Sequence, residues 1–263
     1  MPHAWVLSLS VAFLTVAGVD DAIAQMRQRG GSQQPLDVRE GMGQIVVGLV
    51  PVYPTAHLCP PVASPFGSQT RYDGSARAND HGGFHNGIDI SLTEGTPILA
   101  IAAGEVILSG TGGLLVGNYV WLRHTPADTG LPSYLYSRYQ HLERLSPLPI
   151  GRRINAGDAI GVSGKTGTVG PYYGAAGYPH LHLTLIASDV PHYEVRGDNV
   201  LAPTRRFLDP LAAYMKMPVT LDNQVLRGMS PSDKRVPIPY QTIDGVRMPA
   251  DTKVVWPVAC GKR

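Results

Sequence analysis

Residues 179–185 read Pro179-His180-Leu181-His182-Leu183-Thr184-Leu185, with polar and apolar side chains in alternation. This period of two is typical of a β-strand that buries one of its faces. Side chains two positions apart on a strand lie on the same face, about 7 Å apart. The run therefore predicts a strand that presents the imidazoles of His180 and His182 side by side.

Two earlier runs carry further candidate ligands. The segment Phe84-His85-Asn86-Gly87-Ile88-Asp89-Ile90 and the later Tyr139-Gln140-His141-Leu142 add two histidines and a carboxylate. If the first segment is extended, its even spacing puts His85 and Asp89 on one face. An H-x-H triplet alone is weak evidence in a chain with nine histidines. Three such motifs in one order, each next to strand-like or glycine-rich sequence, form a much more specific pattern.

These side chains suit a zinc site. Zinc in hydrolases takes three protein ligands from His, Asp or Glu, and the water in its fourth position acquires a pKa of about 7. His85, Asp89 and one of the two later histidines form such a set, although spacing does not decide between His180 and His182. The chain lacks both C-x-x-C and H-E-x-x-H, so neither thiolate ligands nor the glutamate base of the second motif is expected. A histidine is the natural proton acceptor instead.

The order His-Asn-Gly-Ile-Asp, Tyr-Gln-His-Leu, Gly-Lys-Thr-Gly and His-Leu-His resembles the lysostaphin-type (LytM-type) zinc metallopeptidases, which cut peptide cross-links in bacterial cell walls. The resemblance covers residues 60–215. It implies one zinc ion per chain, held by His85, Asp89 and His182, and catalytic roles for His141 and His180. Seen alone, His141 would more simply be a structural histidine at a strand end.

The sequence departs from this family around the expected site. Leu183-Thr184 follows the H-x-H, where the family often has an aromatic residue and then an acid, and residues 168–179 form a long insert. Loops of this kind usually wall a substrate groove, and the three tyrosines of the insert either stack on a peptide or cover the site. In the loop 68–83, Arg71, Tyr72 and His81 are candidates to reach a substrate, although solvated loop residues are the ordinary interpretation.

Composition and apolar runs indicate the fold class. Glycine (30) and proline (23) are plentiful and charged residues make up only 16%, which favours many turns and short strands. Short apolar runs occur at residues 96–108, 119–123, 134–139, 159–162 and 181–186, and helical periodicity is absent before residues 208–217. The pattern predicts a mainly β, antiparallel sandwich or barrel-like domain, as the LytM resemblance also implies, with loop-rich N- and C-terminal extensions.

Four segments are expected along the chain. An apolar run at residues 4–19 is shorter than the about 20 residues of a membrane helix and leads to Ala22-Ile23-Ala24, so residues 1–24 resemble a secretory signal peptide. Because the first three residues contain no Lys or Arg, an uncleaved anchor is the alternative. Residues 25–59 are expected to be a flexible lead-in, 60–215 the LytM-type metallopeptidase domain, and 216–263 an irregular extension that wraps it.

The two cysteines, Cys59 and Cys260, lie far apart in sequence. A disulfide between them is expected in an oxidising exported environment, where so long a loop would stabilise the fold by about 5 kcal/mol in the chain-entropy model. Two unrelated free thiols are the alternative.

Together these features predict an exported, periplasmic or extracellular, zinc endopeptidase that hydrolyses peptidoglycan stem peptides or cross-bridges. A zinc-bound water would attack the scissile carbonyl with help from histidines. The main rival is a non-catalytic relative that activates a cell-wall amidase; such relatives have lost ligands, whereas this chain retains them all. A cytoplasmic phosphocarrier with paired histidines conflicts with the signal peptide. No nucleic-acid partner is expected, nor a permanent membrane span if the signal is cleaved.

Overall fold

The computed structural model describes residues 43–77, 83–170, 173–215 and 221–263, together with Met1. Within these residues no helix is both long and apolar enough to span a membrane. Apart from Met1, the expected signal peptide and the lead-in as far as residue 42 lie outside the described residues. The described residues from Gly43 onward belong to one compact unit.

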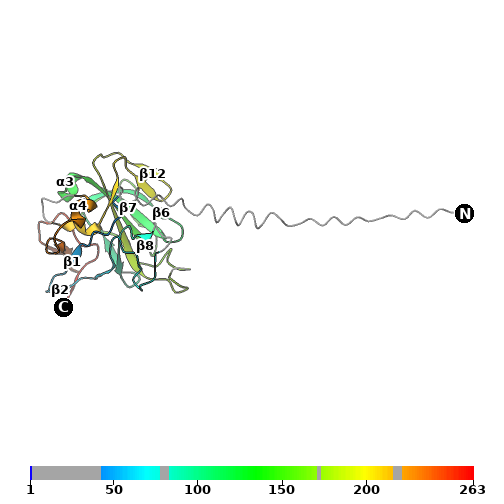
Figure 1. Ribbon diagram of the computed structural model, residues 1–263, viewed down its shortest axis with the longest axis horizontal. Coiled ribbons are helices and arrows are strands. Elements are labelled where there is room, and N and C mark those ends of the chain that lie inside the picture. The colour runs from blue at the N-terminus through cyan, green and yellow to red at the C-terminus, as the bar shows by residue number, and fades with distance from the viewer. Residues whose placement is uncertain (2–42, 78–82, 171–172, 216–220) are drawn as a thin grey trace. The chain divides into compact units, whose positions relative to one another are not determined.

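An eight-stranded antiparallel sheet forms the body of this unit (Figure 1). Its strands lie in the order β3 (Val62–Ser64), β4 (Ile88–Ser91), β11 (His180–Ser188), β8 (Tyr134–Leu142), β7 (Asn118–His124), β6 (Gly104–Thr111) and β9 (Arg153–Ile154), and β14 (Arg206–Leu208) also pairs with β11. The prediction of a mainly β, antiparallel architecture is confirmed.

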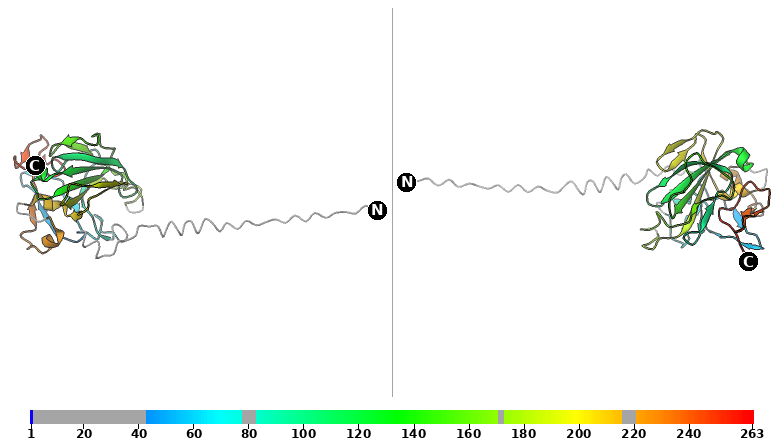
Figure 2. Two further views of the ribbon diagram at one scale, coloured as in Figure 1. Left: turned by 90° about the horizontal axis from the view of Figure 1, so that it is seen from above. Right: turned by 180° about the vertical axis from the view of Figure 1, so that it is seen from behind.

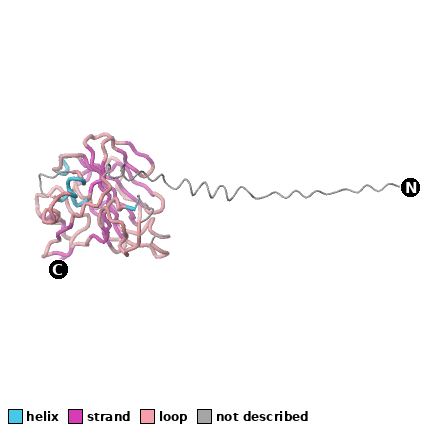
Figure 3. Tube along the Cα trace, in the orientation of Figure 1, coloured by secondary structure: helices cyan, strands magenta, loops and turns pink. Residues whose placement is uncertain are grey.

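Smaller two-stranded pairs and short helices surround this sheet (Figure 3). The pairs are β5 (Pro97–Leu99) with β10 (Ala159–Val162), β12 (Glu194–Arg196) with β13 (Asn199–Leu201), β16 (Tyr240–Gln241) with β17 (Arg247–Met248), β2 (His57–Leu58) with β18 (Gly261–Lys262), and the parallel pair β1 (Val50–Val52) with β15 (Arg235–Pro237). The described helices are α3 (Pro126–Thr129), the 3-10 helix η2 (Pro210–Tyr214) and α4 (Asn223–Arg227). Helical periodicity at 208–217 therefore corresponds to a single short 3-10 helix within the described part of that range.

Both faces of the central strands are buried, and Figure 2 shows the sheet from two further sides. Leu181, Leu183 and Leu185 of β11 pack into the larger apolar core, whereas Ile186 packs into a second cluster around Trp121. The prediction that the alternating run buries only one face was therefore wrong. Its polar face does not meet water, because other segments cover it, and the histidines on that face line a buried site.

The two ends of the described unit are joined through the last forty residues. Cys59 and Cys260 form a disulfide, which confirms the expected bridge. Strands β1 and β2, which precede the site, pair with β15 and β18 from the C-terminal segment. Trp256 is completely buried in the larger core and donates its indole N–H to the carbonyl of Pro60, 3.1 Å away. The C-terminal extension thus contributes to the core as well as wrapping it.

Candidate metal centre

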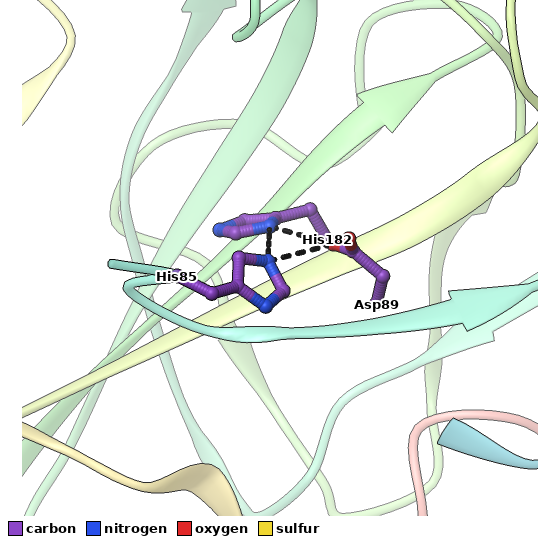
Figure 4. Close-up of side chains that lie close together, drawn as sticks. All are labelled: His85, Asp89 and His182. Atoms are coloured by element: carbon purple, nitrogen blue, oxygen red, sulfur yellow. Dashed lines mark hydrogen bonds and ion pairs between the residues drawn. The ribbon is translucent and has the colours of Figure 1, made fainter. Parts of the chain in front are cut away.

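Pairing between β4 and β11 brings together side chains that lie about ninety residues apart. His182 is directly opposite Asp89 in this antiparallel pair, so both side chains project from the same face. His85 precedes β4 and turns its ring toward the same point (Figure 4). The ligand atoms of His85, Asp89 and His182 all lie within 4.8 Å of one another, and these residues could hold a metal ion.

Three donor atoms converge at this point (Figure 4). The Oδ1 atom of Asp89 lies 3.0 Å from Nε2 of His85 and 2.8 Å from Nδ1 of His182, and the two nitrogens are 3.0 Å apart. All three residues are buried, with exposed fractions of 2%, 2% and 7% in sequence order. Two imidazoles and one carboxylate in this arrangement match the donor set of hydrolytic zinc sites.

The hydrogen bond at the far side of the His85 ring indicates that a cation belongs here. Nδ1 of His85 lies 3.0 Å from the carbonyl oxygen of Pro65. Because a carbonyl only accepts, the neutral ring donates from Nδ1 and carries its lone pair on Nε2. That lone pair faces the Asp89 carboxylate, so two acceptors point at each other, and a metal ion between them would remove the repulsion. The residues therefore fit a bound zinc ion.

Charges and burial favour the metal-binding protonation states of two of the donors, Asp89 and His182. Burial opposes ionisation of Asp89, but the positive charge that His85 and His180 carry when protonated outweighs it and lowers the pKa of this carboxyl well below its usual range. Burial lowers the pKa of His182 to about 3, so its ring is neutral near pH 7. An ionised carboxylate and neutral imidazoles are the forms that coordinate metals.

Two further histidines lie beside the three donors. His180 is on β11, two positions before His182, and its Nε2 lies 3.6 Å from Oδ1 of Asp89. His141 is at the end of β8, and its ring centroid lies 4.4 Å from that of His180. Burial is the main reason that both rings have a lowered pKa; for His141 the neighbouring imidazoles add to the effect. The structure thus brings all five predicted site residues together.

Backbone carbonyls fix the tautomers of this second pair. Nδ1 of His180 donates to the carbonyl of Tyr178 at 2.8 Å, and Nδ1 of His141 donates to the carbonyl of Thr166 at 2.8 Å. Each neutral ring therefore carries its lone pair on Nε2. Nε2 of His180 is buried without a hydrogen-bond partner among the described residues. A buried nitrogen with a free lone pair can accept a proton from a group placed beside it.

The backbone of His141 is itself unusual. Its φ angle is +63°, in the left-handed region that residues with a Cβ atom rarely adopt. Strain of this kind persists where the surrounding structure enforces it, and it is frequent at active sites. The hydrogen bonds from its backbone N–H to Val116 and from its ring to Thr166 hold this conformation.

Aromatic side chains from two loops cover His180. The ring of Tyr178, from the insert, stacks on His180 with centroids 4.6 Å apart, and Tyr72 stacks on Tyr178 at 3.8 Å. The ring centroid of Tyr173 lies 6.4 Å from that of Tyr72 and 5.9 Å from that of His180. Of the two outcomes foreseen for the insert, the structure shows tyrosines that cover the site. His81 lies outside the described residues.

Two residues beside the donors were missed by sequence reasoning. Arg77 contacts the second carboxylate oxygen of Asp89, and Ser64 contacts both Arg77 and His85. Arg77 belongs to an irregular loop, where no periodicity says which side chain turns inward. Ser64 could have been suspected only from a correct pairing of β3 with β4, which places it opposite Asp89.

The antiparallel scaffold and the histidine–aspartate cluster define a β protein with a centre suited to a metal ion. Residues 83–193 match the family model described as Peptidase family M23. This range contains all five residues of the centre.

Named relatives share this region of the chain. An uncharacterized metalloprotease of Buchnera aphidicola is 38% identical over 98 residues, which cover 37% of this chain and 22% of that protein. The peptidoglycan DD-endopeptidase ShyA of Vibrio cholerae is 33% identical over 107 residues, which cover 41% of this chain and 21% of ShyA. The glycyl-glycine endopeptidase ALE-1 of Staphylococcus capitis is 34% identical over 103 residues, covering 39% and 25%. The matched region thus spans about a quarter or less of each relative.

Solved structures give a weaker likeness. The catalytic domain of lysostaphin from Staphylococcus simulans aligns with a TM-score of 0.37 and 23% identity, covering 57% of this chain and 86% of that one. A zinc-containing peptidase from Vibrio cholerae aligns with a TM-score of 0.39 and 21% identity, covering 64% and 39%.

Proposed function

We propose that this chain is a zinc metalloendopeptidase that hydrolyses peptide cross-links of bacterial peptidoglycan after export. The observation that carries the proposal is the convergence of His85, Asp89 and His182 beside two histidines with free Nε2 lone pairs, inside the region that matches the model of Peptidase family M23. The names of ShyA and ALE-1 support an endopeptidase acting on the cell wall. The proposal of export is supported by the apolar run and the A-x-A site within residues 1–24. It is also required by the proposed substrate, because peptidoglycan lies outside the cytoplasmic membrane.

The chain's own residues divide the chemistry between them. Zinc held by His85, Asp89 and His182 would polarise a peptide carbonyl and lower the pKa of a water molecule. Nε2 of His180, with its lone pair free, is placed to take up a proton from the attacking water. Nε2 of His141, next to His180, also carries a lone pair, so this ring would first accept a proton and could then stabilise developing negative charge or protonate the leaving amine. The low exposure of all five residues excludes bulk water from these transfers.

The experiment is mass spectrometry of the fragments released from purified peptidoglycan by the wild-type protein and two variants. His180→Ala should stop turnover and leave one zinc bound per chain, because its ring is not among the three donors. His182→Ala should stop turnover and also lose the zinc. New fragments from wild type alone identify the bond that is cut. Full activity in His180→Ala would contradict the assignment.

The rival function, activation of a cell-wall amidase without catalysis, is not favoured by the site. Every donor and both candidate proton acceptors are present and converge. Zinc-loaded wild type that releases no fragment, yet stimulates an amidase on the same peptidoglycan, would replace the proposed function with this rival.

A further inference from the structure

We propose that Arg77, together with Ser64, is a positioning residue that holds Asp89 so that only one of its carboxylate oxygens faces the metal. The inference rests on the proposed zinc function and extends it to residues outside the donor set. The two carboxylate oxygens of Asp89 have different partners. Oδ1 faces His85 and His182, whereas Oδ2 lies 3.2 Å from Nη2 of Arg77.

The guanidinium of Arg77 is itself fixed by the fold. Its Nε donates to the carbonyl of Thr70 at 3.0 Å, and Nη2 donates to the hydroxyl of Ser64 at 3.0 Å as well as to Asp89. Only 6% of Arg77 and 2% of Asp89 are exposed. A buried guanidinium bound through both Nε and Nη2 has one orientation, so it determines the rotation of the carboxylate that it contacts.

Ser64 connects this arrangement to a second donor. It lies on β3 directly opposite Asp89, and its Oγ is 3.4 Å from Nδ1 of His85. The serine hydroxyl therefore contacts the ring of one candidate ligand and the arginine that orients another. Such outer partners commonly set metal affinity by 10- to 100-fold through the orientation of the ligands.

The positive charge of Arg77 and its positioning of Asp89 should change the zinc affinity in opposite directions. Arg77 carries a positive charge next to a site that must accept a divalent cation, so Coulomb repulsion alone makes Arg77 weaken zinc binding. Removal of the charge would then raise the affinity. If Arg77 acts by positioning, its removal frees Asp89 to rotate and lowers the affinity instead. The direction of the change separates the two effects.

A matched control exists elsewhere in the same sheet. Arg206 on β14 also donates from Nε to a backbone carbonyl, that of Leu221, and from Nη2 to a carboxylate and a serine hydroxyl, those of Asp189 and Ser133. Its strand pairs with β11 at residues 185–187, beyond the histidines. Arg206→Gln removes the same kinds of contact without touching the candidate metal centre.

The test is the zinc dissociation constant of the full-length protein, measured by competition with a chromophoric chelator for wild type, Arg77→Gln, Arg77→Lys and Arg206→Gln. We expect zinc binding to weaken about 10- to 100-fold in Arg77→Gln. It should weaken at least as much in Arg77→Lys, which keeps the charge and loses the planar fork. Arg206→Gln should bind zinc like wild type. Circular dichroism verifies that each variant is folded.

Wild-type affinity or tighter binding in Arg77→Gln would overturn the inference while leaving the proposed peptidase intact. If Arg77→Gln does not fold, the zinc affinity of Arg77→Lys is the test, and wild-type affinity in Arg77→Lys would also overturn the inference. A wild-type protein that binds no zinc would overturn both the inference and the proposed function. Equal weakening in Arg206→Gln would show a general effect of lost packing and would also refute the positioning role.

Discussion

Asp209 is a buried carboxyl whose ionisation should make the free energy of unfolding depend on pH. It caps η2, where its Oδ1 accepts a hydrogen bond from the N–H of Leu211 at 3.0 Å, and only 2% of the residue is exposed. Burial raises its pKa from the usual 3.8 to about 7. The folded state therefore prefers the protonated carboxyl. Its stabilising contribution is complete below about pH 4 and is lost as the pH rises through 7.

The size of the effect follows from the shift. A change of about three units, at 1.36 kcal/mol each, corresponds to about 4 kcal/mol of unfolding free energy at pH 8 or above. Asp209→Asn keeps the shape and the capping oxygen but has no charge to bury. We therefore expect the variant to match wild type near pH 4 and to be more stable by up to about 4 kcal/mol at pH 8.

Urea unfolding at pH 4, 6 and 8, with the disulfide intact, measures this difference. The matched control is Asp222→Asn, which changes the cap of α4 in the same way at a partly exposed position. That control should shift stability by less than about 1 kcal/mol at every pH. Parallel pH profiles for wild type and Asp209→Asn would refute the reasoning, because they would mean that Asp209 does not titrate differently in the folded state.

Three further changes have definite expected results. In Gly87→Ala the new Cβ would lie 2.9 Å from Nε2 of His182 and against the β11 backbone, so we expect a loss of about 1–3 kcal/mol and weaker zinc retention on dialysis; full zinc content would contradict this. Replacing Cys59 and Cys260 by serine should lower the free energy of unfolding by up to about 5 kcal/mol yet leave one zinc per chain, as denaturation and metal analysis would show. Burial lowers the pKa of His124 to about 4, so the stabilising contribution of this residue should be lost as the pH drops from 6.5 to 4; over that range, urea titrations should show wild type losing stability relative to His124→Gln.

Local periodicity and the family resemblance together identified the donors, but they did not show how the fold brings the donors together. The even spacing of His85 and Asp89, and that of His180 and His182, places each pair on one face of its own segment. What brings the pairs together is the register of β4 against β11, in which His182 lies opposite Asp89. Register depends on contacts between segments about ninety residues apart; alternation within one strand rules out slips by one residue but selects neither the partner strand nor the register among steps of two.

Burial was the other property that the sequence did not reveal. Alternating polar residues ordinarily mark a solvated face, yet His180, His182 and Thr184 are almost completely buried. His124 lies outside the recognised motifs, but it is buried between the carbonyl of Ala103 and the hydroxyl of Ser137. In both cases contacts with other segments bury side chains that one strand alone would leave exposed.

The attachment of the C-terminal segment to residues 50–60 means that this part of the fold can form only after the C-terminal segment has been synthesised. Residues 50–60 find their partners in β15, β18, Trp256 and Cys260, all near the other end of the chain. While the chain is being synthesised, residues 50–60 lack these partners until the C-terminal segment has emerged. A nascent chain therefore cannot complete this part of the core until residue 260 has been synthesised.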